Sequence, residues 1–111
     1  MPRRRQPLIA RGDIWDADIP GVGRHPVVVV MRQSTIEIVS AVVCVVVTST
    51  FHGHVAEVEV GVAEGLDHDS AVNCDNVFTL PKSILTTRRG HLGPEKLIQM
   101  NRALGISLDL I

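Results

Sequence analysis

Two valine-rich runs constrain the fold of this chain more than any other feature of its sequence. Pro26 to Met31 and Ala41 to Val47 are apolar throughout. β-Branched side chains favour the pleated backbone, and uninterrupted apolar runs of this length are typical of strands buried on both faces. Pro26 lacks an N–H donor and therefore suits the first position of a strand. We expect the fold to assemble around the first run, with Arg24 and His25 in the loop directly before this strand.

Shorter strands are expected on either side of these runs. Arg11 to Ile19 and Val55 to Val62 each alternate apolar residues with acidic ones, as half-exposed strands do. Ser70 to Asp75 and Phe78 to Pro81 end the strand-rich part of the chain, whereas residues 33–40 are ambiguous. About five short strands in succession indicate a small barrel.

The hydrophobic period changes after Gly93. Apolar residues then recur at spacings of three and four, which predicts a carboxy-terminal helix: Leu97, Met100, Leu104, Leu108 and Ile111. Pro94 fits the first turn of this helix, and Glu95 favours its positive amino end. We expect the apolar stripe to lie on the barrel or on a partner subunit. Gly105 disfavours a helix by roughly 1 kcal/mol relative to alanine, so we expect an irregularity near the end.

Length and charge limit the domain organisation and the binding partners. A chain of 111 residues with 45% hydrophobic residues can bury a core in one domain without metals or disulfides. We expect residues 1–10 to form a basic flexible leader and residues 11–111 a single domain. The formal net charge of −1 excludes a globally basic nucleic-acid coat protein. Either the arginines form a local cationic patch, or the charges form an ordinary solvated surface.

Cysteine placement and the amino terminus predict a cytoplasmic protein. Cys44 and Cys74 lie in strand-like segments, as expected of reduced thiols packed as small hydrophobes, and a disulfide would require neighbouring strands. The basic residues after Met1 are not followed by an apolar segment, so we expect no signal peptide. Both valine-rich runs are too short to cross a bilayer, and we expect no membrane insertion.

The sequence lacks the motifs of several enzyme classes. Its five histidines show neither an HExxH pattern nor paired Cys/His spacing, and His52 with His54 is a weak ligand pair. Neither a GxSxG elbow nor a phosphate-binding Gly-rich loop before a helix is present. We therefore expect no metal and no cofactor.

Polar side chains gather where the predicted strands begin or end. They are Arg24 and His25 before one strand, Thr48, Ser49, Thr50 and His52 after another, and Asp75 and Asn76 after a third. Such groups suit attack of a ribose 2′-OH on its own phosphodiester, which needs an acid, a base and stabilisation of the phosphorane, but no metal. The alternative is that they are ordinary loop residues.

Several short segments are more informative in their order and spacing than singly. They are Arg11 to Trp15, Pro26 to Val30, Val47 to Thr50 followed by Gly53, Glu57 to Val60, Ser70 to Asn76, Thr79 to Pro81, and Gly93 to Glu95. In this order they resemble the MazF/PemK family of toxin endoribonucleases. The resemblance implies a mainly β fold with α, a small SH3-like (CcdB/PemK-like) barrel with a carboxy-terminal helix. It also implies a homodimer, cleavage of single-stranded RNA, often messenger RNA, at short sequences, and an antitoxin partner.

The resemblance also implies a catalytic pair: an arginine directly before the strand proline and a threonine at the end of the later strand. Thr48 matches the threonine. His25 stands at the arginine position, with Arg24 one residue earlier. His52 stands where many members have arginine, and Asp75 matches an acidic residue implicated in some members.

These matches lead to a hypothesis about roles. Histidine, with an ordinary pKa near ~6.5, exchanges protons at neutral pH, whereas arginine stays charged. We hypothesise that His25 is a general acid or base, that Arg24 supports the phosphorane and that Thr48 positions the phosphate or the 2′-OH. The expected RNA-binding residues are Ser49, Thr50, His52, Asp75 and Asn76.

A second class of function stays open, because a fold does not fix a function. A non-catalytic toxin of the same fold, of the CcdB type, would inhibit a protein target such as DNA gyrase. Such an inhibitor would act through its carboxy-terminal residues. This chain ends in Ser107 to Ile111, without the aromatic tip associated with that mode.

Overall fold

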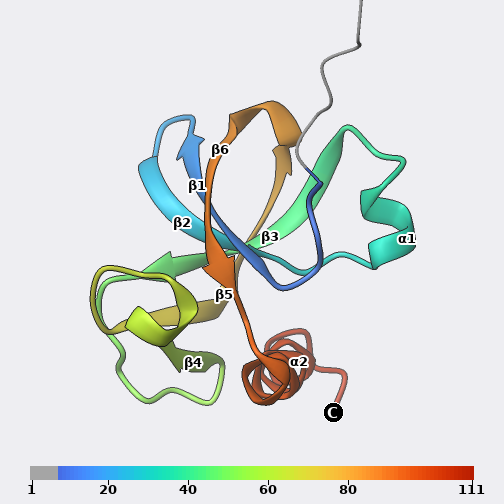
Figure 1. The fold of residues 1–111 in the computed structure, drawn as a ribbon. Helices are drawn as coiled ribbons and strands as arrows, with labels where there is room; N and C mark the ends of the chain where they lie inside the picture. Colours follow the sequence, from blue (N-terminus) through green and yellow to red (C-terminus); the bar gives the residue numbers. More distant parts are fainter. Residues whose placement is uncertain (1–7) are drawn as a thin grey trace, which may run out of the picture.

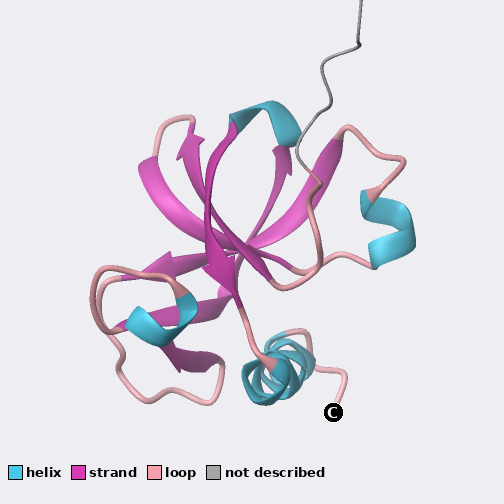
Figure 2. Ribbon diagram, viewed as in Figure 1, coloured by secondary structure: helices cyan, strands magenta, loops and turns pink. Residues whose placement is uncertain are grey.

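Among the described residues, six antiparallel strands form one curled sheet in the order β4-β5-β3-β2-β1-β6. The strands are β1 (Asp13–Ile19), β2 (Gly23–Val29), β3 (Ala41–Thr48), β4 (Glu57–Val60), β5 (Ser70–Pro81) and β6 (Leu85–His91). The helices are α1 (Gln33–Ile36) and α2 (Pro94–Ser107), with short 3-10 turns η1 (Val62–Glu64) and η2 (Lys82–Ile84). The computed structural model describes residues 8–111. Figures 1 and 2 show the sheet curling into a half-barrel with α2 packed beside it, which confirms the predicted fold class.

The two valine-rich runs form the centre of the sheet, as predicted. Val27 and Val29 of β2 belong to one buried cluster and Val28 to another, so this strand is covered on both faces. Met100 and Ala103 of α2 complete the second of these clusters. Burying a valine side chain stabilises the fold by roughly 1.5 kcal/mol or more, so this strand pair is a stable support for the residues at its ends.

β2 begins earlier than predicted. It starts at Gly23, so Arg24 and His25 lie within the strand, and Pro26 is not its first residue. β2 pairs with β1 from Gly23 onward, but the paired residues of β2 and β3 begin only at Val27. Pro26 is tolerated inside the strand because β3 does not pair with it, and its missing N–H costs no ladder bond there.

β5 and β6 also differ from the expected strands. Ser70 to Pro81 is one strand with an irregularity: Val46 pairs with Asn73, whereas Val45 pairs with Val77. The prediction that strands end near Pro81 is wrong, because Leu85 to His91 forms β6 on the edge of the sheet beside β1. Most of its side chains are exposed or half-buried, so it shows no apolar alternation.

The carboxy-terminal helix is confirmed, with a shorter apolar stripe than expected. Met100 is fully buried against the sheet, but Leu108 and Ile111 follow the end of the helix and are exposed. The helix continues through Gly105 to Ser107, and the Gly105 carbonyl accepts a bond from the N–H of Leu110 over 2.7 Å where the chain turns back after the helix. Among the described residues, no helix is long and apolar enough to span a bilayer.

The two cysteines are free thiols. Cys44 and Cys74 lie on neighbouring strands but in separate buried clusters, and no disulfide joins them. Burial raises the pKa of each thiol to about 12, with a further contribution from Asp75 at Cys74. Thiols with such a pKa stay protonated at neutral pH, so these two are packing residues rather than nucleophiles.

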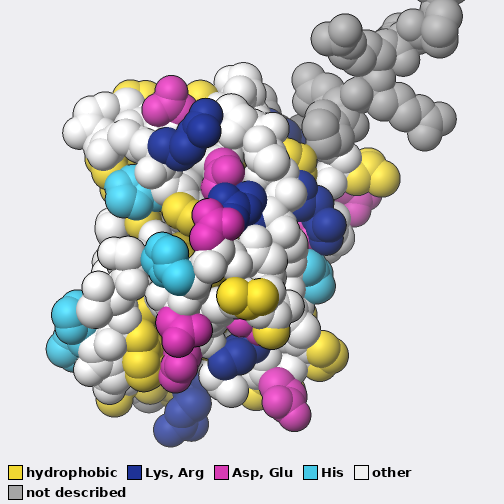
Figure 3. All heavy atoms as spheres, turned by 60° about the vertical axis from the view of Figure 1, so that its left-hand side comes forward, with side chains coloured by type: hydrophobic (Ala, Val, Ile, Leu, Met, Phe, Trp, Pro, Cys, Tyr) yellow, Lys and Arg dark blue, Asp and Glu magenta, His cyan; other side chains and the backbone are white. Residues whose placement is uncertain are grey.

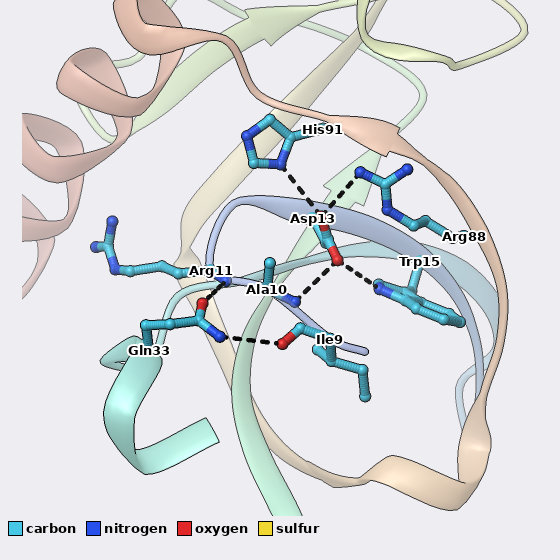
Figure 4. A network of polar contacts seen from close by, with 8 residues as sticks. All are labelled: Ile9, Ala10, Arg11, Asp13, Trp15, Gln33, Arg88 and His91. Atoms are coloured by element: carbon cyan, nitrogen blue, oxygen red, sulfur yellow. Dashed lines mark hydrogen bonds and ion pairs between the residues drawn. The ribbon is translucent and has the colours of Figure 1, made fainter. Parts of the chain in front are cut away.

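A buried carboxylate joins the amino-terminal segment to the sheet edge (Figure 4). Asp13 is 1% exposed and accepts bonds from the Ala10 N–H over 2.9 Å and from the Trp15 indole over 3.3 Å. Its other oxygen contacts Arg88 at 3.2 Å and His91 at 3.1 Å, both on β6.

Residues 1–7 of the predicted leader lie outside the described residues, and its extent stays a prediction.

Replacing Asp13 by asparagine is expected to lower the free energy of unfolding by about 2 kcal/mol at neutral pH. Burial raises the pKa of Asp13, but bonds from Ala10, Arg88, His91 and Trp15 outweigh burial and lower it. The carboxylate therefore stabilises the fold above the ordinary aspartate pKa of about 3.9, and this is lost as pH falls through the folded-state value. Urea unfolding of both proteins across acidic pH measures the difference. A pH-independent difference would contradict this account.

Candidate active site

A cleft of about 160 Å³ opens where β2, β3, β6 and the loop between η1 and β5 meet. Its lining residues are His25, Pro26, Val47, Thr48, Ser49, Leu66, Asp67, His68, Ser70 and Arg89. His25 lies two residues before the part of β2 that pairs with β3, and Thr48 lies two residues after the part of β3 that pairs with β2, and both line the cleft. The structure thus brings together an imidazole and a hydroxyl that are far apart in the sequence.

A second hollow of about 390 Å³ adjoins this cleft. It is lined by Thr48, Ser49, Thr50, His52, His54, Glu57, Asn73 and Asp75. Thr48 and Ser49 line both hollows, so together the two make one continuous polar surface at the end of β3. Thr50, His52 and Asp75 of the predicted RNA-binding set therefore lie beside the cleft rather than in it.

Two predicted residues lie outside both hollows. Arg24 is exposed on β2 and pairs in register with Asp18 of β1, and it lines neither hollow. Asn76 is half-buried at the irregular part of β5 and also lines neither. Their roles stay predictions, and the structure separates both from the pair formed by His25 and Thr48.

Glu57 holds the loop after β3. Its Oε1 accepts the backbone N–H of His52 over 2.9 Å and that of His54 over 3.1 Å. Slight burial raises the pKa of Glu57, but these bonds and the two imidazoles outweigh it and lower the pKa. Thr48 Oγ1 donates weakly to the carbonyls of Thr50 and Ala71, at 3.3 and 3.5 Å. Glu57 therefore holds this loop through the backbone N–H groups of His52 and His54 and not through their side chains.

Sequence reasoning missed the groups that β6 and the η1 loop contribute. The two segments touch through glycines: a Cβ on Gly90 would lie 2.0 Å from the Glu64 carbonyl oxygen, and one on Gly65 2.1 Å from that of Arg89. Gly65 has φ +97°, which also favours glycine. This close backbone approach carries His68 and Asp67 to the cleft. The two glycines were the only hint of this contact in the sequence, and the sequence does not show that they meet in the folded protein.

Arg89 projects into the cleft between two carboxylates. Its Nη1 lies 3.4 Å from both oxygens of Asp16, and its Nη2 lies 2.7 Å from Asp67 Oδ1. The side chain of Arg89 is 22% exposed, that of Asp16 13% and that of Asp67 82%. One partner of the guanidinium is therefore nearly buried, and the other is almost free in solvent.

His68 is a second imidazole in the cleft. Its Nδ1 lies 2.8 Å from the Asp69 carbonyl oxygen, which can only accept, so Nδ1 carries a proton. In the neutral ring, Nε2 then holds the free lone pair and can accept a proton. Ser70, buried beside it, donates to the His68 carbonyl over 3.0 Å and fixes this turn.

The face that holds the cleft is mixed in charge. Figure 3 shows histidine, basic and acidic side chains close together on this side of the molecule, with no single continuous basic area. Among residues 8–111, no group of three or more His, Cys, Asp or Glu side chains is arranged to hold a metal ion. The cleft instead combines neutral hydroxyls, two imidazoles and a paired guanidinium.

Residues 10–108 match the family model described as PemK-like, MazF-like toxin of type II toxin-antitoxin system. The chain belongs to this family. Among its PemK/MazF relatives, the probable endoribonuclease MazF2 of Mycobacterium tuberculosis is 37% identical over 98 residues, covering 87% of this chain and 95% of the relative.

Solved structures of PemK/MazF-family toxins have the same fold as this chain. A mycobacterial endoribonuclease in complex with its cognate antitoxin superposes with a TM-score of 0.83 at 28% identity, covering 93% of this chain and 97% of that one. The Mycobacterium tuberculosis toxin MazF-mt6 gives a TM-score of 0.81 at 28% identity, covering 87% and 96%. The predicted family is thereby confirmed.

Proposed function

We propose that this protein is the toxin of a toxin–antitoxin pair and acts as a metal-independent endoribonuclease on single-stranded RNA. Relatives that align over most of the chain are named endoribonucleases, which supports RNA cleavage as its activity. The observation that carries the chemical proposal is the cleft that holds His25 and Thr48 together. Its groups suit in-line transfer at a phosphodiester without a cofactor.

The proposed reaction is intramolecular transesterification. One imidazole takes the proton of the ribose 2′-OH, and O2′ attacks the adjacent phosphorus. The bond from phosphorus to the 5′ oxygen then breaks, and an acid gives that oxygen a proton. The products are a 2′,3′-cyclic phosphate and a 5′-OH. His25 and His68 line one cleft and supply this acid and base, while the Thr48 hydroxyl positions the phosphate.

The adjoining hollow is the proposed binding surface for neighbouring nucleotides. Ser49 bridges the two hollows, and Thr50, His52 and Asp75 line the second. Hydroxyl, imidazole and carboxylate groups bond base edges on unpaired nucleotides, so this surface suits single-stranded RNA and recognition of a short sequence. Arg24, exposed on β2, and Asn76 are proposed to contact RNA outside the two hollows.

The proposed partners follow the family. One relative was solved with its cognate antitoxin, which supports neutralisation of this chain by an antitoxin of its own. We also propose that it acts as a homodimer, for which the exposed apolar side chains Ile98, Leu110 and Ile111 near α2 offer surface. Two buried free thiols are compatible with the cytoplasm, where RNA targets are found.

Incubation of the purified protein with defined single-stranded RNA is expected to yield specific fragments ending in 2′,3′-cyclic phosphate, at an unchanged rate in excess EDTA. The proposed chemistry needs no metal, so a chelator removes nothing from it. Fragment ends are identified by mass spectrometry. Loss of cleavage in EDTA would contradict metal independence. Intact RNA together with inhibited DNA gyrase supercoiling would favour the alternative, a non-catalytic inhibitor of the same fold.

A further inference from the structure

The cleft needs a positive charge, and Arg24 does not supply one inside it. The phosphorane formed during 2′-OH attack carries extra negative charge, which a fixed cation stabilises strongly in a partly buried site. Arg24 lines neither hollow. Among the residues that line the cleft with His25 and Thr48, Arg89 is the one lysine or arginine. It comes from β6, the edge strand, far along the chain from the other two.

The contacts of Arg89 fix its position while leaving part of it available. Asp16, 13% exposed, holds Nη1 at 3.4 Å from both of its oxygens and so anchors the guanidinium from the sheet side. Asp67, 82% exposed, holds the other end of the guanidinium, with its Oδ1 2.7 Å from Nη2. A guanidinium uses the same N–H donors to bind carboxylate and phosphate oxygens. The position of Asp67 Oδ1 therefore shows where Arg89 can bind a phosphate oxygen.

We propose that Arg89 is the catalytic residue that binds the scissile phosphate, and that Asp67 occupies the phosphate position until RNA displaces it. This proposal rests on the proposed ribonuclease function. An exposed ion pair is worth little, about 1 kcal/mol or less, so a phosphate can displace Asp67 readily. Asp16 stays in place and acts as a positioning residue, which keeps the guanidinium directed at the cleft.

The test compares arginine variants in a cleavage assay on one RNA oligonucleotide whose cut site has been mapped with the parent protein. Arg89→Gln is expected to lower the maximal rate by about 100-fold. Arg89→Lys, which keeps the charge but loses the planar fork, is expected to lose about tenfold. The matched control is Arg102→Gln on the exposed part of α2, which should stay within about twofold of the parent. Parental rates for both Arg89 variants would overturn the proposal.

Binding separates a catalytic Arg89 from a structural ion pair. The probe is the same oligonucleotide with a 2′-deoxy sugar at the mapped cut site, so it binds without reacting. Asp67→Asn is expected to bind this probe about three- to tenfold more tightly, because it removes the competing carboxylate. Unchanged or weaker binding would overturn the role of Asp67. Because Asp67 is exposed, Asp67→Asn should fold normally, so its RNA binding tests the proposal even if Arg89→Gln proves unstable.

The outcomes also distinguish this inference from the function on which it rests. If the parent protein leaves every RNA intact, the proposed ribonuclease function fails, whatever the arginine variants do. If the parent cuts, and Arg89→Gln folds and cuts equally fast, the function stands and the assignment of Arg89 fails. Thermal unfolding of each variant, measured beside the assays, shows whether a lost rate reflects a lost fold.

Discussion

Replacing His25 by alanine will lower the rate of RNA cleavage by roughly 10²- to 10⁴-fold, the contribution expected of a general acid or base. His25 lines the same cleft as Thr48. Its backbone belongs to β2, next to the fully buried Val27 to Val29, so truncating the half-exposed ring should leave the fold intact. Single-turnover cleavage of a mapped RNA measures the chemical step directly.

Two controls make this result specific. His91→Ala removes a histidine of β6 that contacts Asp13 outside the cleft, so it should change stability more than cleavage. Thr48→Ser keeps the hydroxyl and should retain most of the activity, whereas Thr48→Ala should lose it. If His25→Ala and Thr48→Ala both cut at the parental rate, the cleft is not the catalytic site.

Gly90→Ala will lower the free energy of unfolding by about 3 kcal/mol. The added Cβ would lie 2.0 Å from the Glu64 carbonyl oxygen and 3.2 Å from the Gly65 Cα. Both are backbone atoms that no rotamer change can move. The loop after η1 must therefore shift away from β6, taking His68 and Asp67 out of the cleft. Urea unfolding and cleavage of a mapped RNA should both report the change.

Gly93→Ala is the matched control, because a Cβ there meets no atom within 4 Å and its backbone is not left-handed. It adds the same methyl group three residues away and should leave cleavage close to the parental value, with a loss of stability of less than about 1 kcal/mol because alanine is a poorer N-cap than glycine. A Gly90→Ala protein as stable and active as the parent would mean that the contact between the η1 loop and β6 does not hold the site together.

The sequence was most informative where burial repeats with a simple period. The valines of β2 and β3 predict buried strands, and the apolar stripe around Met100 predicts a helix. Both patterns are visible because whole faces of these elements are buried away from water. β6 was missed because it lies on the sheet edge with most side chains exposed or half-buried. Its backbone pairing with β1, rather than any apolar pattern, makes it a strand.

The candidate site could be predicted only where its residues adjoin those patterned strands. His25 and Thr48 flank the buried runs of β2 and β3, so their strands deliver them to one end of the sheet. Arg89 and His68 reach the same cleft through the contact of Gly65 with Gly90, which joins parts of the chain far apart in sequence. No local pattern encodes such a contact, so the sequence points to Arg24, which stands one residue before the arginine position of the family, and not to Arg89.

The most direct test of the account is an RNA with one 2′-deoxy sugar at the mapped cleavage position, incubated with the protein in EDTA. The proposed attack uses that 2′-OH, so cleavage at this position should vanish, while the all-ribose RNA is cut to a 2′,3′-cyclic phosphate. Cleavage at the deoxy position would contradict the account, because the nucleophile would then have to be water or a protein group.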